Sequence, residues 1–327
     1  MLTTIRVLPR SMLAIMLATA VLSARAQEFP NKPIRIVSMY SAGGSGDIVT
    51  RVVAPEIAKS LGQPVIVETM LGASGLIATR SVAKQSQPDG HTLLVLASTV
   101  LTAPVFIKEV GVDFIRDLAP ISIMAEGPLL LMTPMAAPWK DFNQMVAYAK
   151  ANPGKLNTGV PSLQDGTYLF LQAVRQKFGL TFVDVPYKGG GTAYTQAIMV
   201  NEVQLAMTSE GGAAAGIANN TIRVLATTGS RRARSFPEIP TLEELGVPGV
   251  GNNLVMLFAP GATPTPVLDK LNAAVVKALQ VPEIRDRIMK SAAYDVVASR
   301  REDFASALAT NLKHYGDIAR AAGIKPE

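Results

Sequence analysis

Short apolar runs alternate along the chain with segments in which apolar residues recur at helical spacing. Residues 33–39 alternate as a strand does, and the pattern after them predicts a helix that Asp47 can cap and that ends at Leu61. Gly62 stands just past this helix, where glycine commonly ends helices. Pro55 lies inside it and predicts a local kink.

The same alternation continues to the end of the chain. Further strands are predicted at residues 65–67, 92–97, 129–132, 182–185, 203–207, 222–227 and 254–258, and further helices at residues 76–85, 141–151, 167–178, 191–200, 265–279, 282–291 and 302–322. Strands that alternate with helices favour parallel sheets covered by helices on both faces.

A chain of 327 residues exceeds what one hydrophobic core usually serves, so two α/β lobes are expected. No repeat or flexible linker separates them, which suggests that the chain crosses between the lobes twice. The predicted boundaries assign residues 27–128 and 250–327 to lobe I and residues 129–249 to lobe II.

The N-terminus has the pattern of a secretory signal peptide. Arg6 and Arg10 precede the apolar run Met12–Leu22, and the small residues Ser23–Ala26 follow it. The alternative is a membrane anchor, but the run is well short of the roughly 18 to 20 residues that span a bilayer. We therefore predict cleavage after Ala26, removal of residues 1–26, and export of the mature protein.

The charge of the chain changes once this leader is set aside. The formal net charge is +6, and the leader contributes three arginines and no acidic residue, so the mature chain carries +3. This excess is dispersed and lacks a basic block interleaved with aromatics, which argues against a nucleic-acid partner. Arg231, Arg232 and Arg234 form a tight cluster, which we interpret as a solvated loop.

Composition excludes several chemistries. There is no cysteine, so thiolate metal sites and cysteine nucleophiles are impossible, and two histidines cannot form a three-histidine metal site. His91 follows a turn and is predicted to be a surface or capping residue, and His314 is predicted to be solvated. Trp139 is predicted to serve packing.

The densest chemical pattern is the glycine-rich stretch from Ser41 to Asp47, between the first strand and the first helix. Glycines there let backbone N–H groups approach a ligand, and a helix N-terminus carries partial positive charge, so an anion can be held without a basic side chain. The pattern matches neither the dinucleotide motif nor the P-loop. A turn that only connects strand and helix remains the alternative. Ser98 and Thr99 end the third strand and could line the same cleft.

Several short motifs, taken together and in this order, resemble those of one family. They are Phe29–Arg35, Gly43–Asp47, Leu61–Val65, Pro88–Leu94, Asp117–Ile121, Pro153–Asn157, Val185–Gly189, Pro240–Glu244 and Ala259–Pro264. They resemble the extracytoplasmic substrate-binding receptors of tripartite tricarboxylate transporters, the Bug-type or TctC-type receptors, over essentially the whole mature chain.

The resemblance implies an α/β fold of the type II periplasmic binding protein kind, with two lobes, a hinge and a ligand cleft between the lobes. It implies a small organic carboxylate as ligand, gripped through the first-helix loop, a second-lobe loop and ordered water. Transporter subunits in the membrane are the implied partners, and the implied location is the periplasm. The receptor is expected to be a monomer without catalysis, cofactor or metal.

Carrying the family's ligand-binding residues over gives a set of candidates. Together with Ser98 they are Tyr40, Ser41, Gly43, Gly44, Ser45, Gly46, Asp47, Gln164, Asp165, Gly166, Thr167, Tyr187 and Ser209. Asp165 stands where the family usually offers a hydroxyl, and a carboxylate facing a carboxylate is costly unless a proton or cation intervenes. Either Asp165 points away, or the ligand brings an amino group or another donor. We expect one carboxylate at Ser45 and Gly46 and a distal part that is neutral or amine-bearing.

Two other functions remain open at this stage. A loaded receptor could dock on a membrane sensor kinase instead of a transporter. An exported hydrolase using Ser45 as nucleophile would need a nearby base and an orienting acid.

Overall fold

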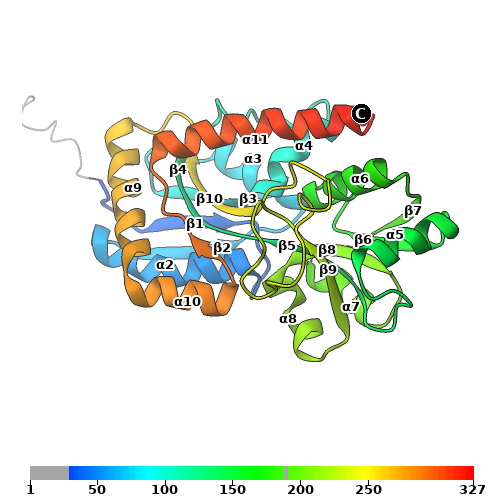
Figure 1. Ribbon diagram of the computed structural model, residues 1–327. Coiled ribbons are helices and arrows are strands. Elements are labelled where there is room, and N and C mark those ends of the chain that lie inside the picture. Colours follow the sequence, from blue (N-terminus) through cyan, green and yellow to red (C-terminus); the bar gives the residue numbers. More distant parts are fainter. Residues whose placement is uncertain (1–28, 188–190) are drawn as a thin grey trace, which may run out of the picture.

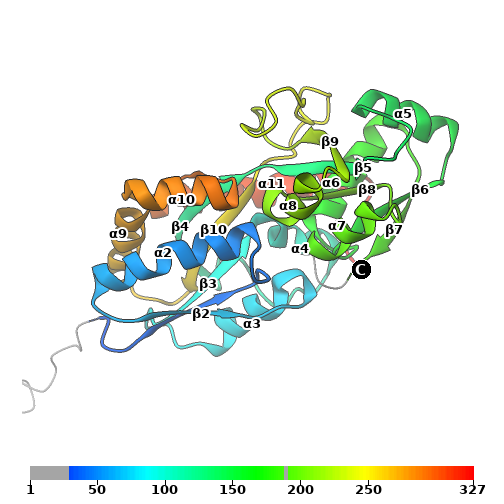
Figure 2. The same ribbon diagram turned by 90° about the horizontal axis from the view of Figure 1, so that it is seen from below.

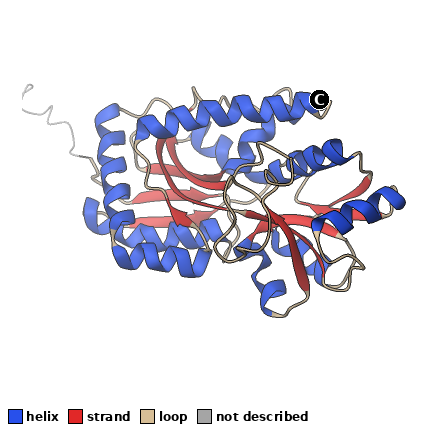
Figure 3. Ribbon diagram, viewed as in Figure 1, coloured by secondary structure: helices blue, strands red, loops and turns tan. Residues whose placement is uncertain are grey.

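The computed structural model describes residues 29–187 and 191–327, which form two mixed β-sheets covered by helices (Figures 1 and 3). The predicted signal peptide and Lys188–Gly190 lie outside the described residues. The six-stranded sheet has the order β11-β4-β10-β3-β1-β2, and the five-stranded sheet has the order β7-β6-β8-β5-β9. Figures 1 and 2 show the two lobes side by side.

The first lobe contains strands from both ends of the chain. Its strands are β1 (Ile34–Ser38), β2 (Val65–Thr69), β3 (Thr92–Ala97), β4 (Leu118–Gly127), β10 (Asn253–Pro260) and β11 (Asp295–Val296). Its helices are α2 (Ser45–Leu61), α3 (Leu76–Gln85), α4 (Ala103–Phe106), α9 (Thr265–Gln280), α10 (Pro282–Ala292) and α11 (Arg301–Ala321), with short 3-10 helices η1 (Ala73–Gly75) and η2 (Ser98–Thr102).

The second lobe is built from the middle of the chain. Its strands are β5 (Leu129–Pro134), β6 (Leu156–Val160), β7 (Phe182–Pro186), β8 (Leu205–Ser209) and β9 (Ile222–Thr227), and its helices are α5 (Phe142–Ala151), α6 (Gly166–Phe178), α7 (Gly191–Met199) and α8 (Glu210–Ala218). The chain passes from one sheet to the other between β4 and β5 and returns through residues 228–252, drawn in yellow in Figure 1.

The sheets are mixed, so the prediction of purely parallel sheets is wrong. β1 pairs in parallel with β2 and β3, but β10 runs antiparallel to both β3 and β4. In the other sheet β5 runs antiparallel to β8 and β9. The reason is that β5 and β10 directly follow the crossings between the lobes, and no right-handed β-α-β unit sets their direction.

The beginning of α2 also differs from the prediction. The helix starts at Ser45, and Gly44 is its N-cap, whereas Asp47 lies in its first turn. The Asp47 carboxylate instead accepts from the Gly43 N–H at 3.1 Å and from Arg51 Nε at 2.8 Å. The predicted end is confirmed, because Gly62 caps the helix with φ 70°. The helix continues through Pro55 without interruption.

Some elements left no detectable pattern in the sequence. Nearly every position of β4 is buried, so it shows no alternation, and Pro120 lies within it. β6 mixes Asn, Thr and Gly with apolar residues, and α8 is composed almost entirely of Gly and Ala.

Helices cover both faces of the six-stranded sheet. Helices α2, α9 and α10 enclose one apolar cluster, in which Val53, Leu271 and Ile288 are buried. The cluster on the opposite face continues into the second lobe, where Phe170 of α6 packs against Tyr315 of α11 with ring centroids 5.9 Å apart. Within the part of the chain that the structure describes, no helix is both long and apolar enough to cross a bilayer.

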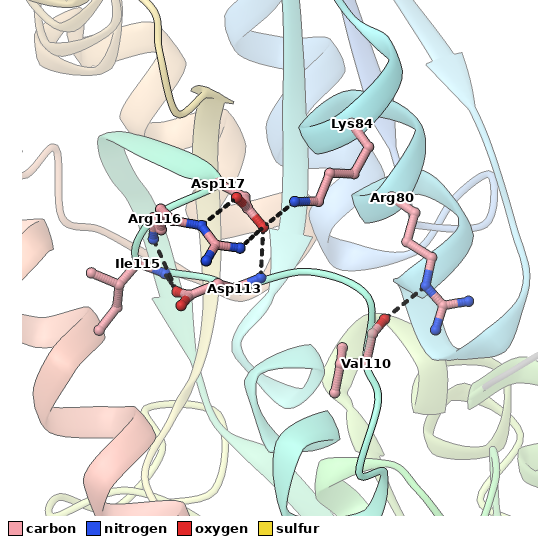
Figure 4. A network of polar contacts seen from close by, with 7 residues as sticks. All are labelled: Arg80, Lys84, Val110, Asp113, Ile115, Arg116 and Asp117. Atoms are coloured by element: carbon pink, nitrogen blue, oxygen red, sulfur yellow. Dashed lines mark hydrogen bonds and ion pairs between the residues drawn. The ribbon is translucent and has the colours of Figure 1, made fainter.

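The segment that leads into β4 is fixed by a polar network (Figure 4). Asp117 pairs with Arg116 at 2.9 Å and with Lys84 of α3 at 2.6 Å, and it accepts from the Asp113 N–H at 2.9 Å. These partners, Arg116 foremost, hold the pKa of Asp117 well below its usual range. Nearby, Arg80 donates to the Val110 carbonyl at 2.8 Å. The network attaches this loop to α3.

Candidate ligand-binding site

The N-terminus of α2 has free hydrogen-bond donors. Its first helical hydrogen bond runs from the Ile48 N–H to the Gly44 carbonyl at 3.0 Å, so the N–H groups of Ser45, Gly46 and Asp47 lie outside the helical ladder. Gly44 has no side chain that could cap them. Such N–H groups together with the helix dipole favour an anion.

Tyr40 closes one side of this helix end. A Cβ atom at Gly46 would lie 2.2 Å from a carbon of the Tyr40 ring, so the ring lies directly against the glycine. The Tyr40 hydroxyl and Ser45 Oγ are both buried, and neither has a hydrogen-bond partner among the described residues. Because unpaired buried polar groups are costly, these two hydroxyls mark a place suited to a polar ligand group. Burial also raises the pKa of Tyr40 well above its usual value.

Tyr294 lies at the centre of the surrounding polar groups. Its hydroxyl accepts from Asn253 Nδ2 at 2.9 Å, and Asn253 Oδ1 accepts from Ser98 Oγ at 3.3 Å. Burial raises the pKa of Tyr294 to about 12, although Asn253, Ser209 and Ser45 oppose the shift. Ser98 is thus linked to this tyrosine through Asn253, while Ser45 and Ser209 lie close enough to influence its pKa. Ser45 and Ser98 belong to the first lobe and Ser209 to the second.

The second lobe meets α2 through the first turn of α8. Ser209 caps α8 by accepting from the Gly212 N–H at 3.3 Å. Gly211, in the first turn, faces Ser45 so closely that a Cβ there would lie 2.5 Å from Ser45 Oγ. The two lobes thus meet at the uncapped end of α2.

A second contact joins the lobes near the end of β3. A Cβ at Gly166, the first residue of α6, would lie 2.9 Å from Thr99 Cα. Ser74 Oγ and Ser162 Oγ lie 3.1 Å apart across the same boundary. The predicted cleft is therefore closed by direct contacts between the lobes.

Asp165 uses its carboxylate within its own helix. It is the N-cap of α6, and its Oδ1 accepts from the Thr167 N–H at 2.8 Å and from Thr167 Oγ1 at 2.7 Å. The side chain is buried, which raises its pKa, while the bonds from Thr167 oppose the shift. The predicted Asp165, Gly166 and Thr167 lie together, next to the Ser98–Thr99 segment.

Other predicted residues lie outside this group. Gln164 is exposed. Tyr187 donates from its hydroxyl to Glu202 Oε1 at 2.7 Å, and burial together with Glu202 raises its pKa to about 12. Ser41 and Gly43 shape the turn before α2, where the Ser41 carbonyl accepts from the Gly44 N–H and Gly43 adopts φ 79°.

Sequence reasoning missed Asn253 and Tyr294. Asn253 begins the apolar strand β10, and a buried amide at a strand start is a weak signal. Tyr294 lies in the short stretch between α10 and β11, which showed no pattern. Asn253 reaches the site because the returning crossing brings β10 between β3 and β4, and Tyr294 because β11, which follows it, pairs with β4.

The aromatic residues with polar groups were predicted with mixed success. Trp139 is buried and packs as expected, with Nε1 donating to Thr133 Oγ1 at 3.1 Å. His91 is buried rather than on the surface, because its ring packs against Phe29, and its Nε2 accepts from the Asn31 N–H at 3.3 Å. His314 is half-buried rather than solvated, with Nε2 2.7 Å from the Gly249 carbonyl.

Comparisons with known proteins agree with this architecture. Among solved structures the chain is similar to the periplasmic binding protein BugD, with a TM-score of 0.83 and 25% identity over 91% of this chain and 100% of that one. It is also similar to MatC from Rhodopseudomonas palustris with bound malate, with a TM-score of 0.80 and 28% identity over 89% of this chain and 100% of that one.

Curated relatives match over most of their length. The chain is 36% identical to the UPF0065 protein in gbd 5'region of Cupriavidus necator, covering 85% of this chain and 84% of that protein. It is 28% identical to protein BugT of Bordetella pertussis, covering 96% and 97%. Residues 49–324 match the family described as tripartite tricarboxylate transporter family receptor.

The fold and the comparisons define a class, the type II periplasmic binding proteins, whose two α/β lobes enclose a cleft. Within this class the chain belongs to the tripartite tricarboxylate transporter family receptors, the TctC or Bug family.

Proposed function

We propose that this protein is a periplasmic receptor that captures a small carboxylate-bearing molecule and delivers it to a tripartite tricarboxylate-type transporter in the membrane. Residues 1–26 are its cleaved signal peptide. Residues 27–128 and 250–327 form lobe I, and residues 129–249 form lobe II. The receptor acts as a monomer and performs no catalysis.

The observation that carries this proposal is the uncapped N-terminus of α2. Its free N–H groups and Ser45 Oγ, which has no partner among the described residues, offer donors to a carboxylate at the point where Gly211 of α8 meets α2. MatC, which contains malate, belongs to the similar structures and supports a carboxylate as ligand class.

The other end of the ligand is expected to be neutral or amine-bearing. Asp165 is buried beside Thr99 and brings a carboxylate close to the cleft. A second free carboxylate of the ligand near Asp165 would meet like charge in a poorly solvated place, which is unfavourable.

A serine hydrolase is less well supported. His91 precedes the amino end of β3, whereas Ser45 follows the carboxyl end of the parallel strand β1. The two residues therefore lie at opposite ends of the strands. His314 contacts Gly249 on the returning crossing. Neither histidine is positioned as a base for Ser45, which such a hydrolase would require.

The test is a thermal-shift and calorimetry screen of the purified mature protein. The panel contains monocarboxylates, amino acids, malate and adipate, and it is repeated on Ser45→Ala. Ser306→Ala, exposed on α11, is the control. A ligand at 100 times its Kd stabilises a protein by about 2.7 kcal/mol, which is easily detected.

We expect a carboxylate to stabilise the wild type and Ser306→Ala but to bind Ser45→Ala weakly. The proposal fails if no carboxylate binds, or if Ser45→Ala binds it as tightly as the wild type. The expectation that the distal part of the ligand is neutral or amine-bearing would be overturned if malate or adipate bound tightly and Asp165→Ser left that binding unchanged. A pull-down with and without ligand separates transporter subunits from a sensor kinase as partners.

A further inference from the structure

The turn between β2 and α3 has an unusual backbone shape and lies where the lobes touch. Its four residues Gly72, Ala73, Ser74 and Gly75 all have positive φ, at 124°, 47°, 50° and 93°. Residues other than glycine rarely adopt this conformation, because the Cβ atom comes too close to the following carbonyl oxygen. Elsewhere among the described residues, non-glycine residues with positive φ occur singly. The turn therefore carries strain at two adjacent residues.

The end of this turn is fixed on the first lobe. The Gly75 N–H donates to the Gly72 carbonyl at 3.0 Å, and a Cβ at Gly75 would lie 2.8 Å from Met39 Sδ. A turn that only connected β2 to α3 would favour glycine at the two central positions as well, since glycine adopts positive φ at little cost. Ser74 instead occupies an unfavourable backbone position, and strained residues of this kind cluster at ligand clamps and switch regions.

The side chain of Ser74 reaches the other lobe. Its Oγ lies 3.1 Å from Ser162 Oγ, in the segment between β6 and α6. Ser162 Oγ also accepts from the Gln164 N–H at 3.2 Å, which orients it and leaves its own proton free to be donated to Ser74. The strained residue thus makes a hydrogen bond that can exist only while the lobes are together.

This hydrogen bond lies far from the two crossings between the lobes. In the six-stranded sheet the first crossing leaves β4 and the second enters β10, whereas β2, which leads into the turn, is the strand at the opposite edge from β11 and β4. In the five-stranded sheet the crossings belong to β5 and β9, whereas Ser162 follows β6. Because opening about the crossings separates most widely the parts farthest from them, a bond at this end restrains opening most effectively.

We propose that Ser74 and Ser162 form a latch that stabilises the closed arrangement of the lobes, and that the strained turn Gly72–Gly75 holds Ser74 within reach of Ser162. Neither serine belongs to the residues predicted to bind the ligand, so both are positioning residues. The latch complements the close approach of Gly166 to Thr99, which is a packing contact. Because the lobes meet through their own atoms, the closed form is populated in the ligand-free protein, and the latch does not depend on which ligand the receptor captures.

The first experiment tests whether the contact forms in solution. The chain has no cysteine, so Ser74→Cys combined with Ser162→Cys gives a protein with a single possible intramolecular disulfide. The two sulfur atoms must come within about 2 Å of each other, so the bond forms only when the lobes are closed. We expect diamide, which oxidises two thiols to a disulfide, to crosslink the ligand-free mature protein, as measured by non-reducing electrophoresis. Each single variant is the control, and a double variant that does not crosslink would overturn the proposal.

The second experiment measures what the latch contributes. Spin labels on Gln85→Cys and Lys150→Cys, one exposed position on each lobe, report the distance between the lobes by double electron–electron resonance. In this background Ser74→Ala and Ser162→Ala are each expected to lower the ratio of closed to open molecules roughly two- to fivefold, as loss of one hydrogen bond does. The variant with both changes is expected to match either one, because the two hydroxyls bond to each other. Ser306→Ala, exposed on α11, is the matched control.

Three outcomes of this second experiment contradict the latch. They are a ratio that Ser74→Ala leaves unchanged, effects of the two serines that add up, and a ligand-free protein that is fully open. Thermal unfolding followed by circular dichroism verifies that each variant is folded, and an alanine variant that opens more while unfolding at the wild-type temperature shows that the serine acts on closure. Both experiments use ligand-free protein, so failure of the carboxylate screen leaves them unaffected.

Discussion

Helices α2 and α6 both begin beside the boundary between the lobes, but a side chain caps the N-terminus of only one of them. α6 is capped by the Asp165 carboxylate, which accepts from Thr167. The N-cap position of α2 is occupied by Gly44, which has no side chain that could accept from the free N–H groups. α8, which also begins at this boundary, is capped by Ser209. Among these three helices the free end is therefore that of α2, where an external anion can replace the missing cap.

The position of one aspartate explains this difference. Asp165 precedes the first helical residue, where its carboxylate reaches the N–H two residues ahead. Asp47 stands two residues inside α2, and its carboxylate is used by Gly43 and Arg51. An acidic residue near a helix start therefore does not by itself cap the helix.

The largest expected effect comes from Gly46→Leu. The new side chain would overlap the Tyr40 ring and displace the free end of α2, so we expect carboxylate affinity to fall roughly 100-fold and the free energy of unfolding to fall by about 1 to 3 kcal/mol. Calorimetry and urea unfolding measure both. Gly251→Ala is the control, since a Cβ there meets open space. Unchanged affinity in Gly46→Leu would mean that this helix end does not hold the ligand.

Two variants, each measured for carboxylate binding and for stability, distinguish the role of the α2 N-terminus from that of the α6 N-terminus. Ser45→Ala is expected to weaken carboxylate binding about tenfold and to leave stability nearly unchanged, because its hydroxyl has no partner to lose among the described residues. Asp165→Ala is expected to lower the free energy of unfolding by about 1 kcal/mol through loss of the cap, with a smaller effect on binding. Titration and denaturant unfolding of both variants test the pattern. The reverse pattern would assign the ligand to α6.

These contrasts also show what the sequence could predict. The bounds of α3 and β3 were predicted to the residue, because Leu76, Val82 and the turn Pro88–Gly90 give clear periodic and turn signals. The start of α2 was placed three residues late, because a glycine-rich turn leaves no local signal of where helical hydrogen bonding begins. Tyr294 and Asn253 were missed because they join the site through the sheet order, which no local pattern encodes.

The pH dependence of stability is expected to reflect the buried carboxyl group of Asp165 at the start of α6. Burial raises the pKa of Asp165, so the folded state keeps this proton to higher pH than the unfolded state does. The contribution to stability is therefore full below the unfolded pKa, about 3.9, and is lost as the pH rises through the folded pKa. We expect wild type to lose stability relative to Asp165→Asn over this window and then to level off. Urea unfolding of both proteins between about pH 3.5 and pH 7 measures this difference, and a constant difference would contradict the expectation.

The smallest effect is expected from Tyr187→Phe. Its hydroxyl bonds to Glu202 at the turn before β8, outside the group around Tyr294. The variant should change carboxylate affinity by less than about twofold, while Tyr294→Phe, which removes the acceptor for Asn253, should change it more. Equal effects of the two variants would extend the binding site to the β7 edge of the second lobe.

The contact between Phe170 and Tyr315 has a consequence for how the molecule comes apart. The apolar cluster that contains both rings belongs to the two lobes at once, so neither lobe has a complete interior of its own on that side. Separating the lobes completely would expose this shared surface to water, and unfolding one would remove the support of the other. We therefore expect heat or denaturant to unfold the protein in a single cooperative transition. The C-terminal helix α11 would couple the two lobes in this transition, because it carries Tyr315.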